Sequence, residues 1–586
     1  MPPAPDPIRE AIAQAEAGRV EQGVASLRRL VQRRPHDAEA VHFLGILLTR
    51  TPQSAQAEFY LRRSVELAPE RGQFRVNHAA HLGDLGRHDE AVIQARGAIE
   101  LTPADSLAWT ALSRSLLERG DSDEAADAAA TAVRLDPALV APRANLGLAL
   151  VQGGRSAEAV AALGDALEAI GEHPALLSMR AVALNYVSAE RAGVRDAHRR
   201  AGAAIARAAG APSASPLSNT RDAEGRLRIG YLSPDFRAHS VAWFIEPVLE
   251  RHDRSAVEVF CYHTLRDADA TTARLRALAD QWCDAGAMDD AGLGRRIRDD
   301  AIDVLVDLAG HTGGNRLGVA VRRPAPVIAT YLGYPNTTGL PGVGWRIVDA
   351  LTDPPGESDT LATERLARLD RCFLCYRPPA DAPEPTRAPG GVAPVFGSFN
   401  TLAKVGSETL DLWADVLRAT PGSRLLLKAK ALGETRARER LTREFERRGV
   451  AGDRLDLVAF TPSAHDHLSL YGRVDVALDT FPYHGTTTTC EALWMGVPIV
   501  TLAGRTHAGR VGISLLHAVG LPEFVAATPD EYARLATAMA LDRARLEMLR
   551  ATLRERVRAS PLCDAAAHAR ALERVYRAMW REWCGA

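Results

Sequence analysis

The N-terminal third of the chain follows a spacing of 34 residues. Prolines keep this interval at Pro35, Pro69, Pro103 and Pro137, and glycines keep it at Gly86, Gly120 and Gly154. After each of these glycines a short polar stretch leads to Glu-Ala, as in "GRHDEA" and "GDSDEA". A glycine between two apolar-periodic helices, with a proline closing the second, predicts a helical hairpin repeated along the chain. Because one hairpin cannot bury its own apolar face, we expect the hairpins to stack into an α-solenoid.

This period resembles the tetratricopeptide repeat. It fades after about residue 175, although the following sequence still favours helix. We therefore predict a tetratricopeptide repeat superhelix over residues 1–206. The stretch "GAPSASPLSNTRDAEGR" is rich in proline, serine and glycine, which predicts a linker over residues 207–226.

From Leu227 the pattern changes to short aliphatic runs separated by amphipathic helices, such as "LRIGYLS" and "IDVLVDLAG". After the proline-rich "YRPPADAPEPTRAPGGVAP" a second series begins, with "RLLLKAK" and "VDVALDTF". Continuous apolar strands between helices indicate parallel sheets covered on both faces. We predict α/β architecture with two doubly wound lobes in a GT-B arrangement, an N-terminal lobe over 227–380 and a C-terminal lobe over 381–560. Residues 561–586 are expected to form a helix that packs back on this region.

Composition excludes several classes of protein. The net charge is −2, which leaves no basic surface typical of nucleic-acid binding. The start "MPPAPDPIREAIAQA" lacks the features of a signal peptide, and no apolar run reaches membrane-spanning length. Cys372 and Cys375 form a lone CxxC without the second pair that a zinc site needs. We expect a cytoplasmic protein with reduced cysteines, no metal site and no membrane contact.

Lysine is nearly absent from the chain. The 71 basic residues include three lysines, which are Lys404, Lys428 and Lys430. A strong coding bias toward arginine explains the rest. A lysine that survives such bias is a candidate for a place where a compact point charge is needed, because the wide fork of arginine cannot replace it.

The stretch "YHGTTTTCEALWMGVPIV", from Tyr483 to Val500, follows a predicted strand and opens a predicted helix. Helix N-termini present unpaired amides and the positive end of the helix dipole, which suit a phosphate group. Gly485 lets the backbone approach a ligand closely, and the threonines add hydroxyl donors. A single N-cap threonine would explain one of the four, so we interpret this turn as a diphosphate-binding site.

Four long motifs occur in a fixed order along the two lobes. They are "RIGYLSPDFRAHS", "LGYPNTTG", "FGSFNTLAKVGSETLDLWADVLRATPGSRLLL" and "LDTFPYHGTTTTCEALWMGVPIVTL". With these motifs and the repeats, nearly the whole chain resembles the bacterial protein O-GlcNAc transferases of the SPINDLY type, glycosyltransferase family 41. The resemblance implies a nucleotide-sugar donor, which we expect to be UDP-GlcNAc, and no further cofactor.

The resemblance assigns roles to residues that match its motifs. Lys404 matches the lysine that neutralises the nucleotide diphosphate, and Thr401 stands where many relatives have glutamine. His467 matches a histidine that packs on the nucleobase, and Glu491 matches an aspartate that holds the ribose.

The threonine turn and one N-terminal-lobe motif are assigned in the same way. Thr487 and Thr488 match a threonine pair on the diphosphate, whereas Thr486 replaces a histidine of the animal enzymes. Leu332 and Gly333 match residues near the donor sugar.

Histidines at strand ends are the candidates for a catalytic base. His239 in "DFRAHS" is favoured by the resemblance, and His311 in "DLAGHTGG" is placed similarly. Lys428 and Lys430, at the end of a strand facing the cleft, are possible electrostatic supports. The alternative for each of these histidines and lysines is a structural or solvated side chain.

The resemblance therefore implies an inverting, metal-independent glycosyltransferase. It would move N-acetylglucosamine from UDP-GlcNAc to serine or threonine hydroxyls of proteins. Two alternatives stay open, a protein O-fucosyltransferase using GDP-fucose and a catalytically inactive repeat scaffold.

In the protein O-GlcNAc transferases a ladder of asparagines lines the repeat groove. The matching positions here are Phe43, Asn77, Ala111 and Asn145, so only two rungs carry asparagine. The resemblance implies that acceptor proteins or peptides bind through this groove, and oligomers through the repeats are possible. The acceptor sequence stays open.

Overall fold

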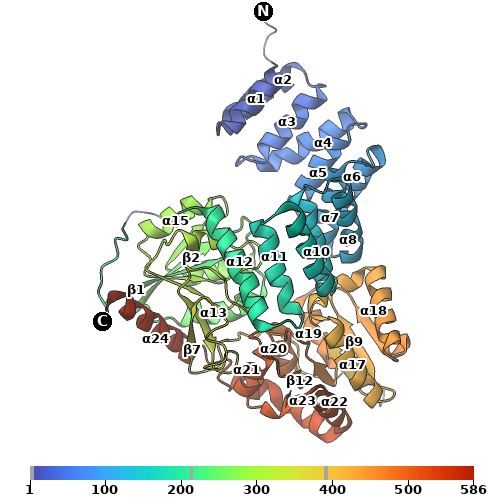
Figure 1. The fold of residues 1–586 in the computed structure, drawn as a ribbon, viewed down its shortest axis with the longest axis vertical. Helices are drawn as coiled ribbons and strands as arrows, with labels where there is room; N and C mark the ends of the chain where they lie inside the picture. The colour runs from blue at the N-terminus through green and yellow to red at the C-terminus, as the bar shows by residue number, and fades with distance from the viewer. Residues whose placement is uncertain (1–5, 212–215, 388–392, 586) are drawn as a thin grey trace, which may run out of the picture. The chain divides into compact units, whose positions relative to one another are not determined.

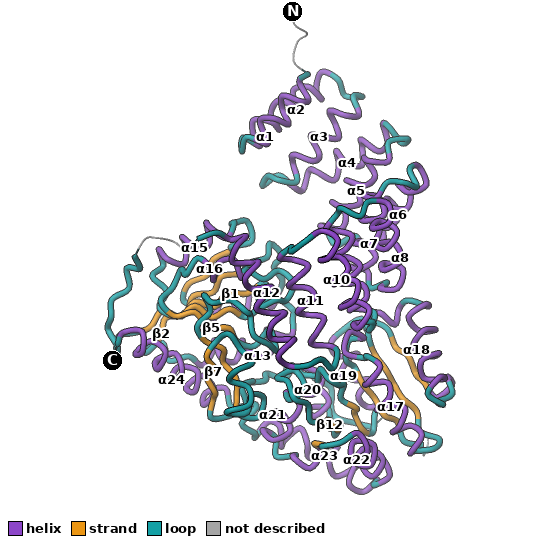
Figure 2. The backbone as a smooth tube through the Cα atoms, viewed as in Figure 1, coloured by secondary structure: helices purple, strands orange, loops and turns teal. Residues whose placement is uncertain are grey.

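The computed structural model describes residues 6–211, 216–387 and 393–585 (Figure 1). Residues 212–215 of the predicted linker and 388–392 of the proline-rich bridge lie outside the described residues. The chain divides into two compact units, Met1–Gly153 and Gly154–Ala586. Among the described residues, the first unit contains helices and the second contains every strand, as Figure 2 shows by colour.

The first unit is a run of paired helices. They are α1 (Pro7–Glu16), α2 (Val20–Arg33), α3 (Ala38–Leu48), α4 (Ala57–Leu67), α5 (Gly72–Asp84), α6 (His88–Leu101), α7 (Ser106–Arg119), α8 (Ser122–Leu135) and α9 (Val140–Gln152). Gly86 and Gly120 fall in the turns inside pairs, with φ of 73° and 103° that favour glycine. Pro69 and Pro103 fall in the turns that follow the second helix of a pair. The predicted helical repeat is confirmed.

The two asparagines of the predicted ladder make contacts within the first unit. The side-chain nitrogen of Asn77 lies 2.9 Å from Nε2 of His42, and that of Asn145 donates to the carbonyl of Thr110 at 3.4 Å. Both contacts join neighbouring repeats. Peptide binding by this surface stays a prediction.

The second unit begins with three further helices, α10 (Ser156–Ile170), α11 (Pro174–Ala183) and α12 (Arg191–Ala209). The sequence placed them in the repeat array, which it extended to residue 206. Polar contacts explain why they cluster with the lobes instead. Nε2 of His198 and the side-chain nitrogen of Asn185 lie 2.7 and 2.9 Å from the buried hydroxyl of Tyr334.

The N-terminal lobe is a parallel sheet with strand order β3-β2-β1-β4-β5-β6-β7. Its strands are β1 (Leu227–Ser233), β2 (Val257–His263), β3 (Gln281–Asp284), β4 (Val304–Asp307), β5 (Val327–Thr330), β6 (Trp345–Asp349) and β7 (Arg365–Leu369). The helices between them are α13 (Ser240–Arg251), α14 (Ala270–Leu278), α15 (Asp290–Asp299) and α16 (Leu317–Val321). The order reverses at β1, and ligands bind beyond the carboxyl ends of strands at such a point.

The C-terminal lobe is a second parallel sheet, with order β10-β9-β8-β11-β12-β13. Its strands are β8 (Val395–Ser398), β9 (Arg424–Lys428), β10 (Leu455–Val458), β11 (Val476–Leu478), β12 (Ile499–Leu502) and β13 (Val525–Ala526). Its helices are α17 (Ser407–Ala419), α18 (Thr435–Arg447), α19 (Ala464–Ser469), α20 (Thr487–Trp494), α21 (Val511–Ala518), α22 (Pro529–Leu541) and α23 (Arg543–Arg558). The predicted pair of doubly wound α/β lobes is confirmed.

The last helix, α24 (Ala565–Cys584), returns to the N-terminal lobe and packs on α13, β5 and β7 (Figure 1). Two of its polar side chains form hydrogen bonds there. The Tyr576 hydroxyl lies 3.1 Å from that of Tyr231, and Glu573 accepts from Nδ1 of His252 at 2.8 Å. No helix in the described part of the chain is both long and apolar enough to cross a bilayer.

Candidate functional site

A cavity of about 330 Å³ lies between the two lobes of the second unit. Its lining comes from both sheets and their following loops: His239, Ser240, Val241, Phe244, Leu332, Gly333, Pro335, Phe373, Leu374, Asn400, Thr401, Lys404, Tyr483, Thr486, Thr487, Thr488, His507 and Val511. Much of this lining follows the carboxyl ends of strands, where ligands of doubly wound sheets bind. The cavity brings together many of the residues predicted from sequence.

The threonine turn forms one wall of the cavity. Buried Asp479, just after β11, shapes it by accepting from the amide of Gly485 at 2.7 Å. A Cβ on Gly485 would lie 2.5 Å from Oγ1 of Thr488, so the turn requires glycine. Helix α20 begins at Thr487, with no side-chain cap at its N-terminus. Its first amides are therefore available to an anion, as the sequence predicted.

The threonines of this turn differ in their hydrogen bonds. Oγ1 of Thr488 donates to the side-chain oxygen of Asn400 at 3.0 Å. Among the described residues, the buried hydroxyls of Thr487 and Thr489 have no hydrogen-bond partner. Thr487 lines the cavity, whereas Thr489 does not. A buried hydroxyl without a partner is costly, so the Thr487 hydroxyl is suited to a ligand.

Lys404 lies beside this turn, at the end of the 3₁₀ turn η3 (Leu402–Lys404). Its Nζ donates to the carbonyl of His484 at 2.7 Å and lies 4.3 Å from the ring centroid of Tyr483. Tyr186, which follows α11, stacks on the Tyr483 ring, with the two ring centroids 4.9 Å apart. Burial lowers the pKa of Lys404 to about 8. An ammonium beside a helix N-terminus is chemically suited to a diphosphate.

His239 is the N-cap residue of α13 on the N-terminal-lobe side of the cavity. Its Nδ1 accepts from the amide of Val241 at 3.3 Å and lies 3.5 Å from Asp235. Burial lowers the pKa of His239, and the charge of Asp235 opposes this shift. When Nδ1 accepts a hydrogen bond, the neutral ring carries its proton on Nε2. In this geometry Nε2 of His239 is a hydrogen-bond donor. For Nε2 to act as a base, the hydrogen bond from the Val241 amide to Nδ1 must break.

Leu332 and Gly333 form a tight turn after β5. Leu332 has a φ of 73°, an uncommon conformation for a leucine. A Cβ on Gly333 would lie 1.9 Å from the carbonyl oxygen of Leu308, which excludes any larger residue. The turn brings both residues to the cavity wall.

Three predicted residues, one each from the end of β9, α19 and α20, form a chain outside the cavity lining. Nδ1 of His467 lies 3.0 Å from Nζ of Lys428, and its Nε2 lies 3.0 Å from Glu491. We call this set the nucleoside trio. Burial lowers the pKa of Lys428, and Glu491 opposes the shift. Both ring nitrogens of His467 are occupied, so the face of its ring is what remains for a ligand.

The other predicted residues separate into two groups. Thr401 is exposed and lines the cavity, whereas Lys430 is exposed on the turn after β9 and does not.

His311 is buried away from the cavity lining. Its Nδ1 lies 2.8 Å from the Ser178 hydroxyl and its Nε2 lies 2.8 Å from the Thr338 carbonyl. Burial lowers the pKa of His311 to about 4. With both nitrogens occupied, His311 joins α11 to the N-terminal lobe, which favours the structural interpretation.

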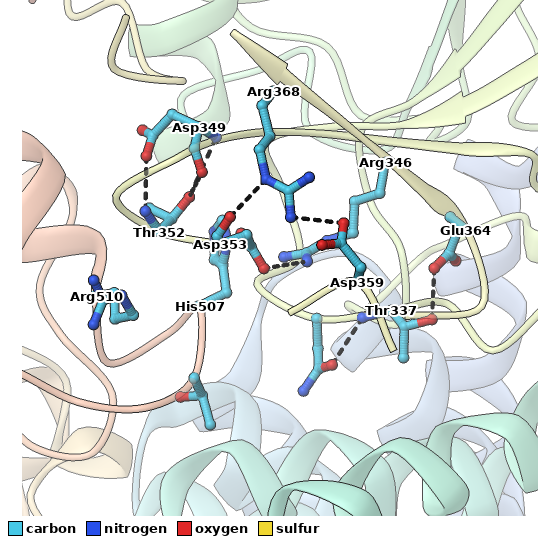
Figure 3. Close-up of polar contacts among 12 residues, drawn as sticks. Thr337, Arg346, Asp349, Thr352, Asp353, Asp359, Glu364, Arg368, His507 and Arg510 are labelled. Carbon is cyan, nitrogen blue, oxygen red and sulfur yellow. Dashed lines mark hydrogen bonds and ion pairs between the residues drawn. The ribbon is translucent and has the colours of Figure 1, made fainter. Parts of the chain in front are cut away.

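Sequence reasoning missed several polar residues on the cavity wall, among them Ser240, Asn400 and His507. His507, in the loop after β12, has Nδ1 at 2.5 Å from the carboxylate of Asp353 (Figure 3). Asp353 also pairs with Arg346 at 3.3 Å, and all three side chains are buried. Burial alone would raise the pKa of Asp353, but Arg346 and His507 hold it below its usual range. The glycines in "LAGRTHAGRVG" were the available signal of a ligand loop.

Hydrogen bonds hold the same loop against the N-terminal lobe. Asp349 accepts from the Ser514 hydroxyl at 2.5 Å and from the amide of Phe373 at 2.9 Å. Nε of Arg510 donates to the carbonyl of Leu351 at 2.6 Å. The two lobes are thus joined by paired polar groups directly behind the cavity.

Metal-ligand geometry is not found in the described ranges, where no three histidine, cysteine or acidic side chains group as a metal site. Cys372 and Cys375 are buried free thiols, and burial raises the pKa of each to about 12. The Asp269 carboxylate caps the N-terminus of α14.

A family model described as glycosyl transferase family 41 matches residues 207–376 and 388–572. The chain is 43% identical over 417 residues to the "Probable UDP-N-acetylglucosamine--peptide N-acetylglucosaminyltransferase SPINDLY" of Arabidopsis thaliana, an alignment that covers 69% of this chain and 45% of the plant protein. The protein of the same name from Petunia hybrida is 45% identical over 374 residues, covering 62% of this chain and 40% of its own length. The chain therefore spans less than half the length of these relatives.

A solved structure of a mutant of the Thermobaculum terrenum O-GlcNAc transferase is also similar. It is 40% identical, aligns with a TM-score of 0.82, and the alignment covers 88% of this chain and 98% of that chain.

Proposed function

Since the chain belongs to glycosyl transferase family 41, we propose that it transfers N-acetylglucosamine from UDP-GlcNAc to serine or threonine hydroxyls of proteins. The observation that carries the proposal is the pairing of Lys404 with the uncapped N-terminus of α20 in one cavity. The printed names of the plant relatives and the Thermobaculum protein support the choice of donor and acceptor.

The chemistry follows from where charge develops. The acceptor oxygen forms a bond to the anomeric carbon while the bond from that carbon to the β-phosphate oxygen breaks, which inverts the configuration. The nucleoside diphosphate leaves with the bonding electrons, and the hydroxyl proton passes to a base. Preorganised donors at the leaving group are the largest catalytic contribution in such a step. We propose that Lys404, the α20 amides and the Thr487 hydroxyl supply them without a metal ion.

The nucleoside trio supports a place for the uridine. His467 offers its ring face to the base, and Glu491 has a carboxylate that can accept from ribose hydroxyls. The trio lies around α20 beyond the diphosphate wall, so one nucleotide would span both. Thr401 then lies on the exposed rim near the phosphates.

The acceptor side of the proposal rests on the helical repeat. We propose that acceptor proteins or peptides bind along the first unit, as the family resemblance implies. All seven cysteines are free thiols, which supports a reducing, cytoplasmic setting.

Calorimetry with UDP, UDP-GlcNAc, GDP and GDP-fucose, without added metal, tests the function. We expect uridine nucleotides to bind wild type and to bind Lys404→Ala much more weakly. Lys404→Arg is the matched variant, because it keeps the charge but not the compact ammonium.

Other outcomes would replace the proposal. Preference for guanosine nucleotides would favour fucosyl transfer from GDP-fucose. Absence of nucleotide binding in folded protein would favour a repeat scaffold without catalysis.

A further inference from the structure

The buried chain of Arg346, Asp353 and His507, whose residues are drawn in Figure 3, ends at the cavity. Arg346 lies near the start of β6, Asp353 lies in the loop after β6, and His507 lies in the loop after β12. We call these three residues the β6 trio. Of the three, only His507 lines the cavity. A charged pair buried behind one cavity-lining histidine needs a reason beyond stability, because buried ion pairs contribute little net stability.

The order of groups in the β6 trio fixes which ring nitrogen carries the proton. Arg346 keeps Asp353 ionised, so the carboxylate can only accept hydrogen bonds. Nδ1 of His507 must therefore donate to it, and in the neutral ring Nε2 holds a lone pair. Burial lowers the pKa of His507, which favours the neutral ring, while Asp353 and Asp349 oppose the shift. Within the described ranges, no residue forms a hydrogen bond with Nε2.

The loop of His507 also braces the diphosphate wall. The amide of His484 donates to the carbonyl of Ala508 at 3.0 Å, and the carbonyl of His484 accepts from Lys404 at 2.7 Å. Two hydrogen bonds therefore connect Lys404 to Ala508, the residue that follows His507. The nucleoside trio lies outside the cavity lining. If the nucleoside binds at the trio, the part of the cavity next to the N-terminal lobe is left for the sugar, which is attached to the other end of the diphosphate.

We infer that His507 accepts, through Nε2, a hydrogen bond from a hydroxyl group of the sugar being transferred, and that Asp353 and Arg346 position it for this contact. This inference rests on the proposed function, because it takes the ligand to be a nucleotide sugar. His507 is then a specificity-determining residue that distinguishes donors by the hydroxyl they present. The Asp349 and Arg510 hydrogen bonds between the lobes keep its loop in place.

The test separates the sugar from the nucleotide. Binding of UDP and of UDP-GlcNAc is measured by calorimetry in wild type, His507→Leu and His507→Gln. We expect UDP affinity to change less than about twofold and UDP-GlcNAc affinity to fall about tenfold in His507→Leu, since one hydrogen bond from a hydroxyl is lost. His507→Gln should recover part of the affinity, because its amide oxygen can take the place of Nε2.

A fourth variant changes the tautomer without removing the ring. In Asp353→Asn the new amide donates to Nδ1, so His507 carries its proton on Nε2 and becomes a donor. UDP-GlcNAc affinity should again fall while UDP affinity holds. If this variant does not fold, the two His507 variants carry the test, because their UDP affinity reports an intact cavity.

A set of deoxy-sugar donors identifies the hydroxyl. The analogue that lacks it should bind wild type and His507→Leu equally, whereas the others keep the about tenfold difference.

Three results would overturn the inference. They are equal loss of UDP and UDP-GlcNAc affinity, no loss of either, or a fall in kcat with donor affinity unchanged, which would indicate a base. Failure of wild type to bind any uridine nucleotide overturns the proposed function instead. GDP and GDP-fucose, if bound, then take the places of UDP and UDP-GlcNAc in the same test of His507.

Discussion

The nucleoside trio and the β6 trio each combine a cation, a carboxylate and a histidine, but in a different order. In the nucleoside trio the histidine stands between a cation and a carboxylate, and both ring nitrogens of His467 are occupied. In the β6 trio the carboxylate stands in the middle, and one nitrogen of His507 is left facing the cavity. The nucleoside trio is partly exposed, whereas the β6 trio is buried.

This difference in order separates two uses of histidine. A ring held at both nitrogens is fixed in plane and offers its face, which suits stacking on a flat base. A ring held at one nitrogen offers a directed lone pair, which suits a single hydroxyl. Shape recognition and hydrogen-bond recognition can therefore come from the same residue types, depending on which member is central.

The largest expected effect comes from the residue between the two trios. Lys404→Ala should lower kcat by about a hundredfold to a thousandfold, because it removes a preorganised donor from the leaving group. Transfer kinetics at saturating donor measure this. An effect below tenfold would mean that the amides of α20 carry the charge alone.

The pH dependence of nucleotide binding tests whether Lys404 supplies the charge that attracts the diphosphate. Burial lowers its pKa to about 8, so the ammonium that attracts the diphosphate is present below this pH and is lost as pH rises through it. UDP affinity should fall about tenfold between pH 7 and pH 9, with proton uptake on binding at the higher pH. Calorimetry in buffers of different ionisation enthalpy measures both quantities. The dependence should vanish in Lys404→Ala, and its persistence there would assign it to another group.

The nucleoside trio is tested by keeping or removing the ring. His467→Ala should weaken UDP binding about tenfold, because stacking is lost, while His467→Phe keeps most of the affinity. Calorimetry with UDP and uridine compares them. Equal losses in both variants would show that the hydrogen bonds of His467 matter more than its face, and the contrast with His507 would fail.

The smallest expected effect concerns the threonine turn. Thr487→Val should weaken UDP binding about fivefold and leave the melting temperature nearly unchanged, since the hydroxyl has no protein partner to lose. Thr489→Val is the matched control, because its hydroxyl is also buried and unpartnered but lies outside the cavity lining. A similar loss in both variants would point to packing of α20 rather than a phosphate contact.

The sequence predicted those parts of the site that are local in the chain. A strand, a glycine, threonines and a helix occupy consecutive positions, so helix geometry alone places their amides together. The 34-residue period likewise predicted the helix pairs. Lys404 was found through composition, since it is one of three lysines.

The sequence could not predict which side chains far apart in the chain contact each other in the folded protein. Asp353 and His507 are 154 residues apart, and nothing in either motif indicates the other. His239 and His311 look equivalent in sequence, each following a strand. They differ because Ser178, from a helix placed in the repeat array, occupies a nitrogen of His311. The second compact unit likewise begins at Gly154, inside the predicted array, because the period describes helices and not the surface that they pack against.

Because the chain has few lysines and the pKa of Lys404 is lowered, Lys404 can be labelled selectively by amine-reactive reagents. Amine-reactive reagents attack the uncharged amine, which is a large fraction of Lys404 at pH 8 and a small one for an ordinary exposed lysine. Of the three lysines, Lys430 is exposed, whereas Lys428 is partly buried and has a lowered pKa. In the proposed site, Lys404 would contact the diphosphate of the nucleotide and Lys428 would lie near its nucleoside. A mild acylating label should therefore modify the site in preference to the surface, and a bound nucleotide should protect it.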